Sequence, residues 1–156
     1  ALDKPLVDFP GAGAAGGMGF AAQVALGAEL TPGIELVMRH CQFDCLLKKC
    51  DWVVTGEGRL DGQSLAGKTP IGVSKAAAVQ GVPVVVLAGS LGDGWQNAYQ
   101  AGVTAAFSLV DGPVLLVDAI AHTNKLIEDR CEALARLMTV NQINNLPKEV
   151  FSHANS

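Results

Sequence analysis

Hydrophobic and polar positions along the chain form two kinds of stretch, short unbroken apolar runs and longer runs with apolar residues near helical spacing. The short runs predict strands at 51–55, 83–88 and 104–110, and PLVDF at 5–9 could be a further extended stretch. The amphipathic stretches predict helices at 20–30, 33–41, 43–50, 70–80, 93–101 and 116–138. The run IELVM inside 33–41 could instead be a strand.

The alternation of strands and helices predicts an α/β fold, a Rossmann-like three-layer arrangement around a parallel sheet. PVVVLAG at 83–89 is unbroken and apolar, as expected of a strand that helices cover on both faces. Ligands in such folds bind beyond the carboxyl ends of the strands. The loops expected at 56–69 and 89–93 would therefore lie at the functional edge of the sheet.

The pattern also divides the chain into three parts. Residues 1–38 are glycine-rich and are expected to belong to, or to border, a second α/β domain. Residues 39–139 carry the Rossmann-like pattern. Residues 140–156 are rich in asparagine without a sustained apolar face and predict a peripheral tail.

Composition and charge exclude two classes of function. With 156 residues, 49% of them hydrophobic, the chain can bury one core. The net charge of -4 and the absence of a Lys/Arg run argue against a nucleic-acid partner. No apolar run reaches the roughly 18 residues that span a bilayer, and no basic, then apolar leader is present, so no membrane role and a cytoplasmic location are expected.

The cysteines predict buried, reduced thiols that pack as small hydrophobes. They are Cys41, Cys45, Cys50 and Cys131, and His40 precedes the first of them. A metal site is the alternative, but the spacing lacks the paired C-x2-C knuckles of zinc sites.

The stretch GEGRLDGQSLAGKTP at 56–70 contains the letters of a phosphate loop, G-x-x-x-x-G-K-[ST]. The matching residues are Gly62, Gly67, Lys68 and Thr69. A true phosphate loop needs a strand running into its first glycine and a helix opening at its lysine. The strand is predicted to stop near Thr55, and Pro70 disfavours helical geometry at Thr69. We therefore predict that the match is accidental.

The same stretch gathers polar side chains at the carboxyl end of a strand. They are Glu57, Arg59, Asp61, Ser64, Lys68 and Thr69. The glycines among them allow close approach of a ligand, which favours a functional site. The alternative is that Arg59 and Asp61 only pair with each other to rigidify the turn.

A second glycine pattern, G-x-G-x-x-G, occurs at Gly11, Gly13 and Gly16 and is typical of dinucleotide sites. Its context is weak. Pro10 stands where the preceding strand should end, and no strand ending in an acidic residue follows about 20 residues later. Close packing of a helix explains these glycines nearly as well.

Two stretches together, PGAGAAGGMG at 10–19 and VVTGEGRLDGQSLAGKTPIGV at 53–73, resemble the bacterial glycerate kinase family, the type I, two-domain kinases. GVPVVVLAG at 81–89 and AFSLVDGP at 106–113 resemble it in order and spacing, so the likeness covers about residues 1–139. The resemblance implies transfer of the γ-phosphate of ATP to glycerate, generally giving 2-phosphoglycerate, in a cleft between two α/β domains outside the phosphate-loop class.

Members of that family are longer, so the resemblance implies that this chain is the C-terminal part of such an enzyme. The N-terminal remainder of the same enzyme is then its partner. This piece alone is not expected to be active.

Phosphoryl transfer needs cationic groups around the phosphate and a carboxylate that holds magnesium or orients the acceptor hydroxyl. It also needs a group that binds the carboxylate of the acceptor. We expect Lys68 to supply phosphate charge, Arg59 to bind the glycerate carboxylate, and Asp61 with Glu57 to hold Mg²⁺ or act as general base. Ser64 and Thr69 would donate hydrogen bonds to the substrate. The phosphates of the nucleotide are expected on backbone amides at the start of the first helix, at Gly11, Gly13, Ala14, Ala15, Gly16 and Gly17.

Two other classes stay open. A nicotinamide-dependent enzyme or dinucleotide-binding domain would use the GAGAAG pattern. A non-catalytic α/β interaction domain would use neither loop.

Overall fold

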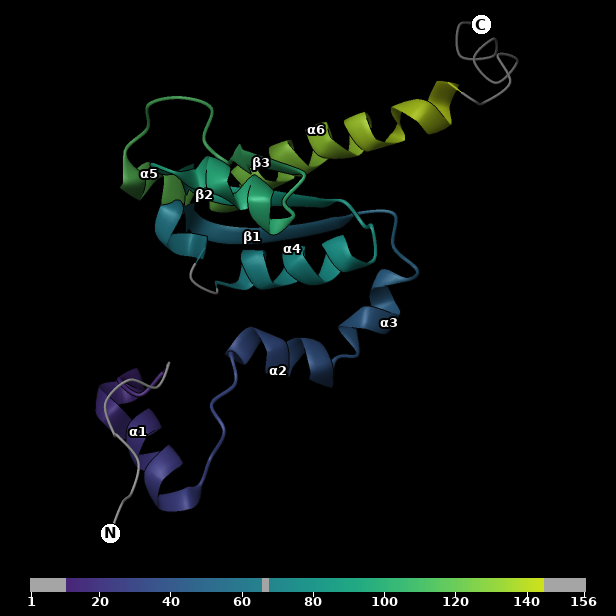
Figure 1. Cartoon of the computed structure of the whole chain (residues 1–156). Helices are drawn as coiled ribbons and strands as arrows, with labels where there is room; N and C mark the ends of the chain where they lie inside the picture. Colours follow the sequence, from purple (N-terminus) through teal and green to yellow (C-terminus); the bar gives the residue numbers. More distant parts are fainter. Residues whose placement is uncertain (1–10, 66–67, 145–156) are drawn as a thin grey trace, which may run out of the picture.

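The computed structural model describes residues 11–65 and 68–144 (Figure 1). Helices are labelled α, strands β and 3-10 helices η. The elements in chain order are α1 (Ala14–Leu26), α2 (Gly33–His40), α3 (Phe43–Leu47), β1 (Val53–Leu60), η1 (Gly62–Leu65), α4 (Thr69–Val79), β2 (Val84–Leu91), η2 (Trp95–Ala101), β3 (Ala105–Ser108), α5 (Leu116–Ala121) and α6 (Thr123–Asn144). The extended stretch predicted at 5–9 lies outside the described residues.

The strands form a three-stranded parallel sheet in the order β1-β2-β3. Figure 1 shows α4 along one face of the sheet and α6 along the other. The predicted α/β class, with a parallel sheet between two helical layers, is confirmed.

The central strand β2 packs into cores on both faces, which explains its unbroken apolar run. Val84, Val86 and Ala88 are buried on the side of α4, where Leu60 and Ile71 join them. The alternate residues Val85 and Leu87 pack against Leu134 of α6. Fully burying one such aliphatic side chain contributes about 1.5–3 kcal/mol, so the three layers are held together chiefly through this strand.

Both long strands extend beyond their predicted ends. β1 continues through residues 56–60, which we predicted as loop, and β2 continues through Ser90 and Leu91. The register carries the pairing on to Leu60 opposite Leu91. The prediction was wrong because glycines and charged residues alternate along the end of β1 as they do in a loop, and this strand pairs on one side only within residues 11–65 and 68–144.

The two strands approach closely at a pair of glycines. A Cβ atom on Gly89 would lie 2.5 Å from the carbonyl oxygen of Gly58. Only glycine fits at position 89 without moving the backbone of β1, so this residue sets the distance between the strands next to their carboxyl ends.

The helix predictions hold in part. The helix expected at 33–41 is α2, so the strand alternative for IELVM is wrong, and Ile34 of α2 packs on α4 at Gly72. The segment 93–101 forms the 3-10 helix η2 between two left-handed glycines, Gly94 and Gly102, so Asp93 does not cap it.

The long helix predicted at 116–138 is two helices, α5 and α6, which divide at His122. The hydroxyl of Thr123 donates back to the carbonyls of Ala119 and Ile120, which satisfies groups freed by the break. α6 then runs on to Asn144, so the predicted end of the helix at 138 was wrong, and the first residues of the segment predicted as a tail are helical.

Gly89→Ala should destabilise the full-length protein by about 1–3 kcal/mol, because the added methyl group meets backbone that cannot move without parting β1 from β2. Gly112→Ala is the matched control, since a Cβ atom at Gly112 would meet nothing within 4 Å. Urea unfolding of both variants measures the difference. Equal stabilities would contradict the close approach of the strands.

Candidate functional site

The loops that follow β1 and β2 are tied together at the carboxyl edge of the sheet. The amide of Gly62 donates to the carbonyl of Asp93 at 2.9 Å, and the amide of Gly92 donates to the carbonyl of Leu60 at 2.7 Å. These crossed hydrogen bonds continue the ladder past the last strand residues. Side chains from both loops are therefore held around one place.

That place is a hollow of about 300 Å³ lined by Arg59, Asp61, Gly62, Gln63 and Asp93. It holds one guanidinium and two carboxylates. The Arg59 side chain is 63% exposed, whereas that of Asp61 is 20% exposed. The cation is thus accessible to a ligand, and the carboxylate beside it is largely enclosed.

Asp61 is held by bonds to both of its oxygens. Its Oδ2 accepts from Nε of Arg59 at 3.2 Å, and its Oδ1 accepts from the amide of Gln63 at 3.1 Å in the first turn of η1. The pairing of Arg59 with Asp61 that we considered as an alternative is present. It orients the guanidinium and does not remove it from solvent, so it is compatible with binding an anion.

Gly92 lies directly against the guanidinium. A Cβ atom on Gly92 would lie 2.7 Å from Nη2 of Arg59 and 3.0 Å from Cζ. The absence of a side chain at this position therefore leaves the space that the guanidinium occupies. Sequence reasoning brought the 89–93 loop to this edge but named neither Gly92 nor Asp93 as a site residue.

Glu57 lies elsewhere. Its Oε1 accepts from the amide of Gly58 at 3.0 Å, and the residue lines a second hollow of about 660 Å³ between β1 and α6. The predicted pair of Asp61 and Glu57 is thus divided between two hollows. Asp93 shares the hollow of Asp61 instead.

Lys68 and Thr69 lie at the start of α4. Lys68 is the extended N-cap residue and Thr69 the first helical residue, and both are exposed. Pro70 carries no amide hydrogen, and the amides of the two residues after it donate to the carbonyl of Lys68 at 3.1 and 3.2 Å. The position of Lys68 and Thr69 at the positive end of the helix dipole suits a phosphate group. Ser64 belongs to η1, and its side chain is outside what the structure describes.

Both objections to a phosphate loop were wrong as stated. β1 ends at Leu60, with Asp61 alone between it and Gly62, and α4 begins at Thr69 with Pro70 in its first turn, where proline is tolerated. What distinguishes this segment is η1, a 3-10 helix over Gly62–Leu65 where a phosphate loop would wrap openly around its ligand. Gly67 lies outside the described residues.

The N-terminal glycine segment is bent more sharply than predicted. Ala15, Gly16 and Gly17 have φ of 51°, 69° and 96°, so α1 does not begin as one regular helix whose first amides point at a ligand. A Cβ atom on Gly19 would lie 2.3 Å from the carbonyl oxygen of Gly11, which shows how tightly the bend closes.

This bend does not reach the hollow at the strand ends. Figure 1 shows α1 apart from the sheet layers, below α4, and the hollow is lined by residues of the two strand-end loops alone. The structure therefore does not bring Gly13, Ala14 and their neighbours together with Arg59 and Asp61.

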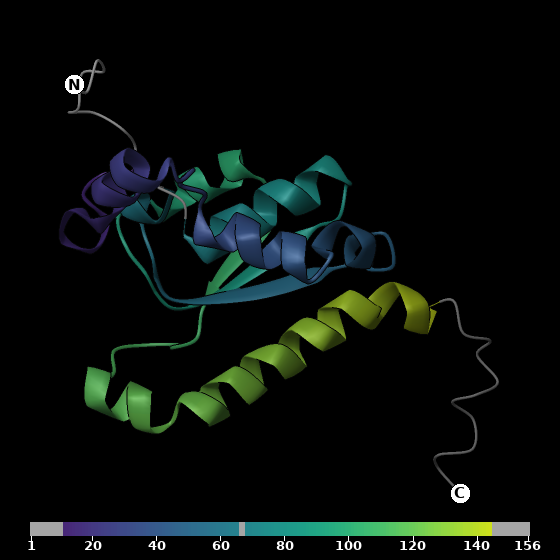
Figure 2. The same cartoon turned by 90° about the horizontal axis from the view of Figure 1, so that it is seen from below.

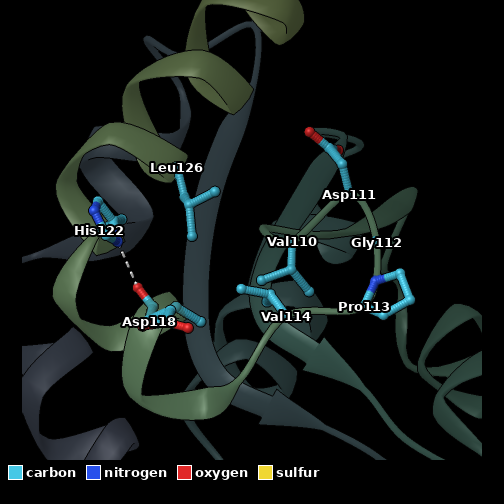
Figure 3. Close-up of a pocket in the computed structure, with 9 residues that line it drawn as sticks. Val110, Asp111, Gly112, Pro113, Val114, Asp118, His122 and Leu126 are labelled. Atoms are coloured by element: carbon cyan, nitrogen blue, oxygen red, sulfur yellow. Dashed lines mark hydrogen bonds between the residues drawn. The ribbon is translucent and has the colours of Figure 1, made fainter.

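A further hollow of about 320 Å³ follows β3 (Figure 3). Val110 and Val114 face Leu126 across it, and Nδ1 of His122 bonds the carbonyl of Asp118 at 2.8 Å. It is mainly apolar and includes none of the predicted site residues.

The prediction that the cysteines are buried was wrong, because all four are exposed. Within residues 11–65 and 68–144, no three His, Cys, Asp or Glu side chains lie together as metal ligands. In the same part of the chain, no helix combines the length and the apolar character that crossing a membrane requires.

Comparison with known proteins identifies the family. The model of the glycerate kinase family matches residues 1–139. This chain belongs to the glycerate kinase family. A glycerate kinase of Halalkalibacterium halodurans is 45% identical over 141 residues, which are 90% of this chain and 37% of that protein.

Two other relatives agree. The glycerate 2-kinase of Escherichia coli K12 is 47% identical over 110 residues, 70% of this chain and 29% of its own length. A crystal structure of a candidate glycerate kinase 2 from Salmonella typhimurium LT2 has a TM-score of 0.63 and 34% identity, over 87% of this chain and 34% of that one. The chain thus spans about a third of the length of the relatives it matches, consistent with a C-terminal part.

Gly92→Ala should displace the Arg59 guanidinium, because the new methyl group would occupy its place. The stability of the full-length protein should change little, since a flexible side-chain end can move. The affinity for a carboxylate ligand should fall about 10-fold, the effect of weakening one charge-assisted hydrogen bond. Calorimetric titration with glycerate measures this, with Gly112→Ala as control, and unchanged affinity would contradict the positioning role of Gly92.

Proposed function

We propose that this chain supplies the acceptor-binding part of an ATP-dependent glycerate kinase, which transfers the γ-phosphate of ATP to glycerate and gives 2-phosphoglycerate. The observation that carries the proposal is the Arg59 guanidinium, exposed and held by Asp61 over Gly92 at the carboxyl edge of a parallel sheet. The family assignment and the name of the Escherichia coli relative support the reaction and the position of transfer.

Arg59 binds the carboxylate of glycerate. A planar guanidinium matches a carboxylate bidentately, and the contact of Asp61 with Nε sets the orientation of that plane. The hollow of about 300 Å³ has room for a small hydroxy acid. The acceptor hydroxyl then lies among the carboxylates of Asp61 and Asp93.

Asp61 acts on the attacking hydroxyl. In phosphoryl transfer a carboxylate orients the hydroxyl and accepts its proton as the oxygen attacks the γ-phosphorus and the bond to ADP breaks. The bonds of Asp61 to Arg59 and to the Gln63 amide fix the carboxylate in place for this. Ser64 and Thr69 would add hydrogen bonds to the substrate.

Lys68 and the amino end of α4 bind the transferring phosphate. The lysine ammonium and the positive end of the helix dipole both favour negative charge at this end of the helix. Lys68 is exposed and can reach a ligand that the remaining part of the enzyme delivers.

The oxygen donors at the hollow fit magnesium. Mg²⁺ is commonly bound by one or two carboxylates together with substrate phosphates and water. Asp61 and Asp93 line one hollow and meet that description better than the predicted pair of Asp61 and Glu57. When bound there, the ion would neutralise charge on the phosphate oxygens.

The nucleotide needs the rest of the enzyme. Because α1 lies apart from the hollow, the glycine bend at Gly11, Gly13, Ala14, Ala15, Gly16 and Gly17 can serve the ATP phosphates only if the two parts of the site come together in the full-length protein. The N-terminal remainder is the partner we propose for this. Activity therefore belongs to the whole protein and is not expected of this chain alone.

Arg59→Ala should lower kcat/KM for glycerate about 10- to 100-fold in the full-length protein, the range expected for a lost charged hydrogen-bond pair. Arg59→Lys should restore only part, because an ammonium cannot form the planar fork. Coupled ADP release measures both, with Lys49→Ala, an exposed lysine outside the site, as control. Failure of the unmodified enzyme to release ADP with glycerate would reject the proposed function, and saturable NAD(P) binding would favour the dinucleotide alternative.

Asp61→Asn should keep the turn, because an amide oxygen can still accept from Gln63, but should lower kcat at least 100-fold through loss of the proton acceptor. Thermal unfolding provides the control for structure. Near-normal kcat with unchanged stability would show that Asp61 only shapes the turn.

A further inference from the structure

One side chain that lines the hollow at the strand ends has no role in the chemistry proposed above. The hollow of about 300 Å³ is lined by Arg59, Asp61, Gly62, Gln63 and Asp93. In the proposed function, Arg59 binds the acceptor carboxylate, and the two aspartates serve the attacking hydroxyl and Mg²⁺. Gln63 is exposed, and its side-chain amide bonds to no other residue in the part of the chain that the structure describes. Its hydrogen-bonding capacity is therefore available to a ligand in the hollow.

The backbone holds Gln63 in a fixed relation to the charged residues. Gln63 is the second residue of η1, and its amide donates to Oδ1 of Asp61 at 3.1 Å. The amide of the preceding Gly62 donates to the carbonyl of Asp93 at 2.9 Å. The other oxygen of Asp61, Oδ2, accepts from Nε of Arg59 at 3.2 Å. The Cα atom of Gln63 is therefore positioned by the same carboxylate that orients the guanidinium.

Glycerate presents three polar groups to such a site. It carries a carboxylate and two hydroxyls, and one of the hydroxyls becomes the phosphate ester. With the carboxylate on Arg59 and the attacking hydroxyl at Asp61, the second hydroxyl is left to be recognised. A hydroxyl both donates and accepts hydrogen bonds, so it pairs best with a group that does the same.

Gln63 is the described side chain at the hollow that meets this need. A guanidinium only donates and an ionised carboxylate only accepts, whereas the amide of glutamine does both. Among the described residues, α5 and α6 contribute none to the lining of the hollow, and Figure 2 shows these helices across the strands from α4. Recognition of the second hydroxyl by this part of the chain therefore depends on Gln63.

The size of the hollow cannot select glycerate by itself. A space that admits glycerate also admits a smaller 2-hydroxy acid such as lactate, which has hydrogen in place of the second hydroxyl. A side chain that hydrogen-bonds this hydroxyl favours glycerate, because it is left without its partner when lactate binds. A glutamine amide does not titrate, so it cannot accept the proton of the attacking hydroxyl. Its contribution is selection of the acceptor.

We propose that Gln63 is a specificity-determining residue, which binds the acceptor hydroxyl that is not phosphorylated and so selects glycerate over 2-hydroxy acids that lack this hydroxyl. The inference rests on the proposed function, which supplies the acceptor and the place of its carboxylate. Arg59, Asp61 and Gln63 then bind the three polar groups of glycerate from alternate positions of one turn.

Calorimetric titration of the full-length protein with glycerate, and with lactate of the same configuration, tests this role. The unmodified protein should bind glycerate about 10-fold more tightly, the effect of one hydrogen bond from an exposed group. Gln63→Met keeps the length of the side chain and the backbone amide that bonds Asp61 but removes the polar group. It should weaken glycerate binding about 10-fold and change lactate binding by less than about 2-fold.

Gln96→Met is the matched control, because Gln96 is an exposed glutamine of the neighbouring η2 and is not among the residues that line the hollow. It should leave both affinities unchanged. Equal weakening of the two acids by Gln63→Met, or unchanged binding of glycerate, would overturn the role of Gln63. Equal affinity of the unmodified protein for glycerate and lactate would overturn it as well.

The proposed function can fail separately. ADP release with glycerate, together with equal effects of Gln63→Met on the two acids, would refute the role of Gln63 alone. Selective binding of glycerate that depends on Gln63, without ADP release, would refute the kinase function alone. Binding of neither acid would refute both.

Discussion

The structure of the site depends on the close approach of β1 to β2 at their carboxyl ends. Gly89 leaves no room for a side chain against the carbonyl of Gly58, and the crossed bonds of Gly62 and Gly92 carry the pairing into both loops. Each such bond contributes only about 1 kcal/mol, but their positions are set by the ladder behind them. The charged residues can therefore be held in one arrangement although they lie on loops at the surface.

In that arrangement, the residues that shape the turn are also those proposed to perform the chemistry. Asp61 accepts from the Gln63 amide and from Arg59, so it begins η1 and orients the guanidinium at once. Gly92 supplies the space in which the guanidinium lies. This explains how two readings of the sequence, a rigidifying ion pair and a ligand-binding cation, can both describe Arg59.

Sequence reasoning predicted the fold class from the alternation of strands and helices, and the unbroken apolar run of β2 indicated a strand that helices cover on both faces. The same reasoning missed the length of β1, because Glu57 and Arg59 alternate with glycines along its end in the manner of a loop. Gly92 and Asp93 could not be assigned, since their contacts join loops about 30 residues apart and depend on the strand register. The break at His122 was missed because apolar spacing runs through it, and α1 was predicted too regular because its left-handed residues include Ala15.

A crystal structure of the full-length protein with glycerate bound tests the central claim most directly. The account predicts the glycerate carboxylate within about 3 Å of the Arg59 guanidinium, with Gly92 behind it and the acceptor hydroxyl toward Asp61. Glycerate bound away from the ends of β1 and β2, with the Arg59 side chain turned from it, would contradict the account.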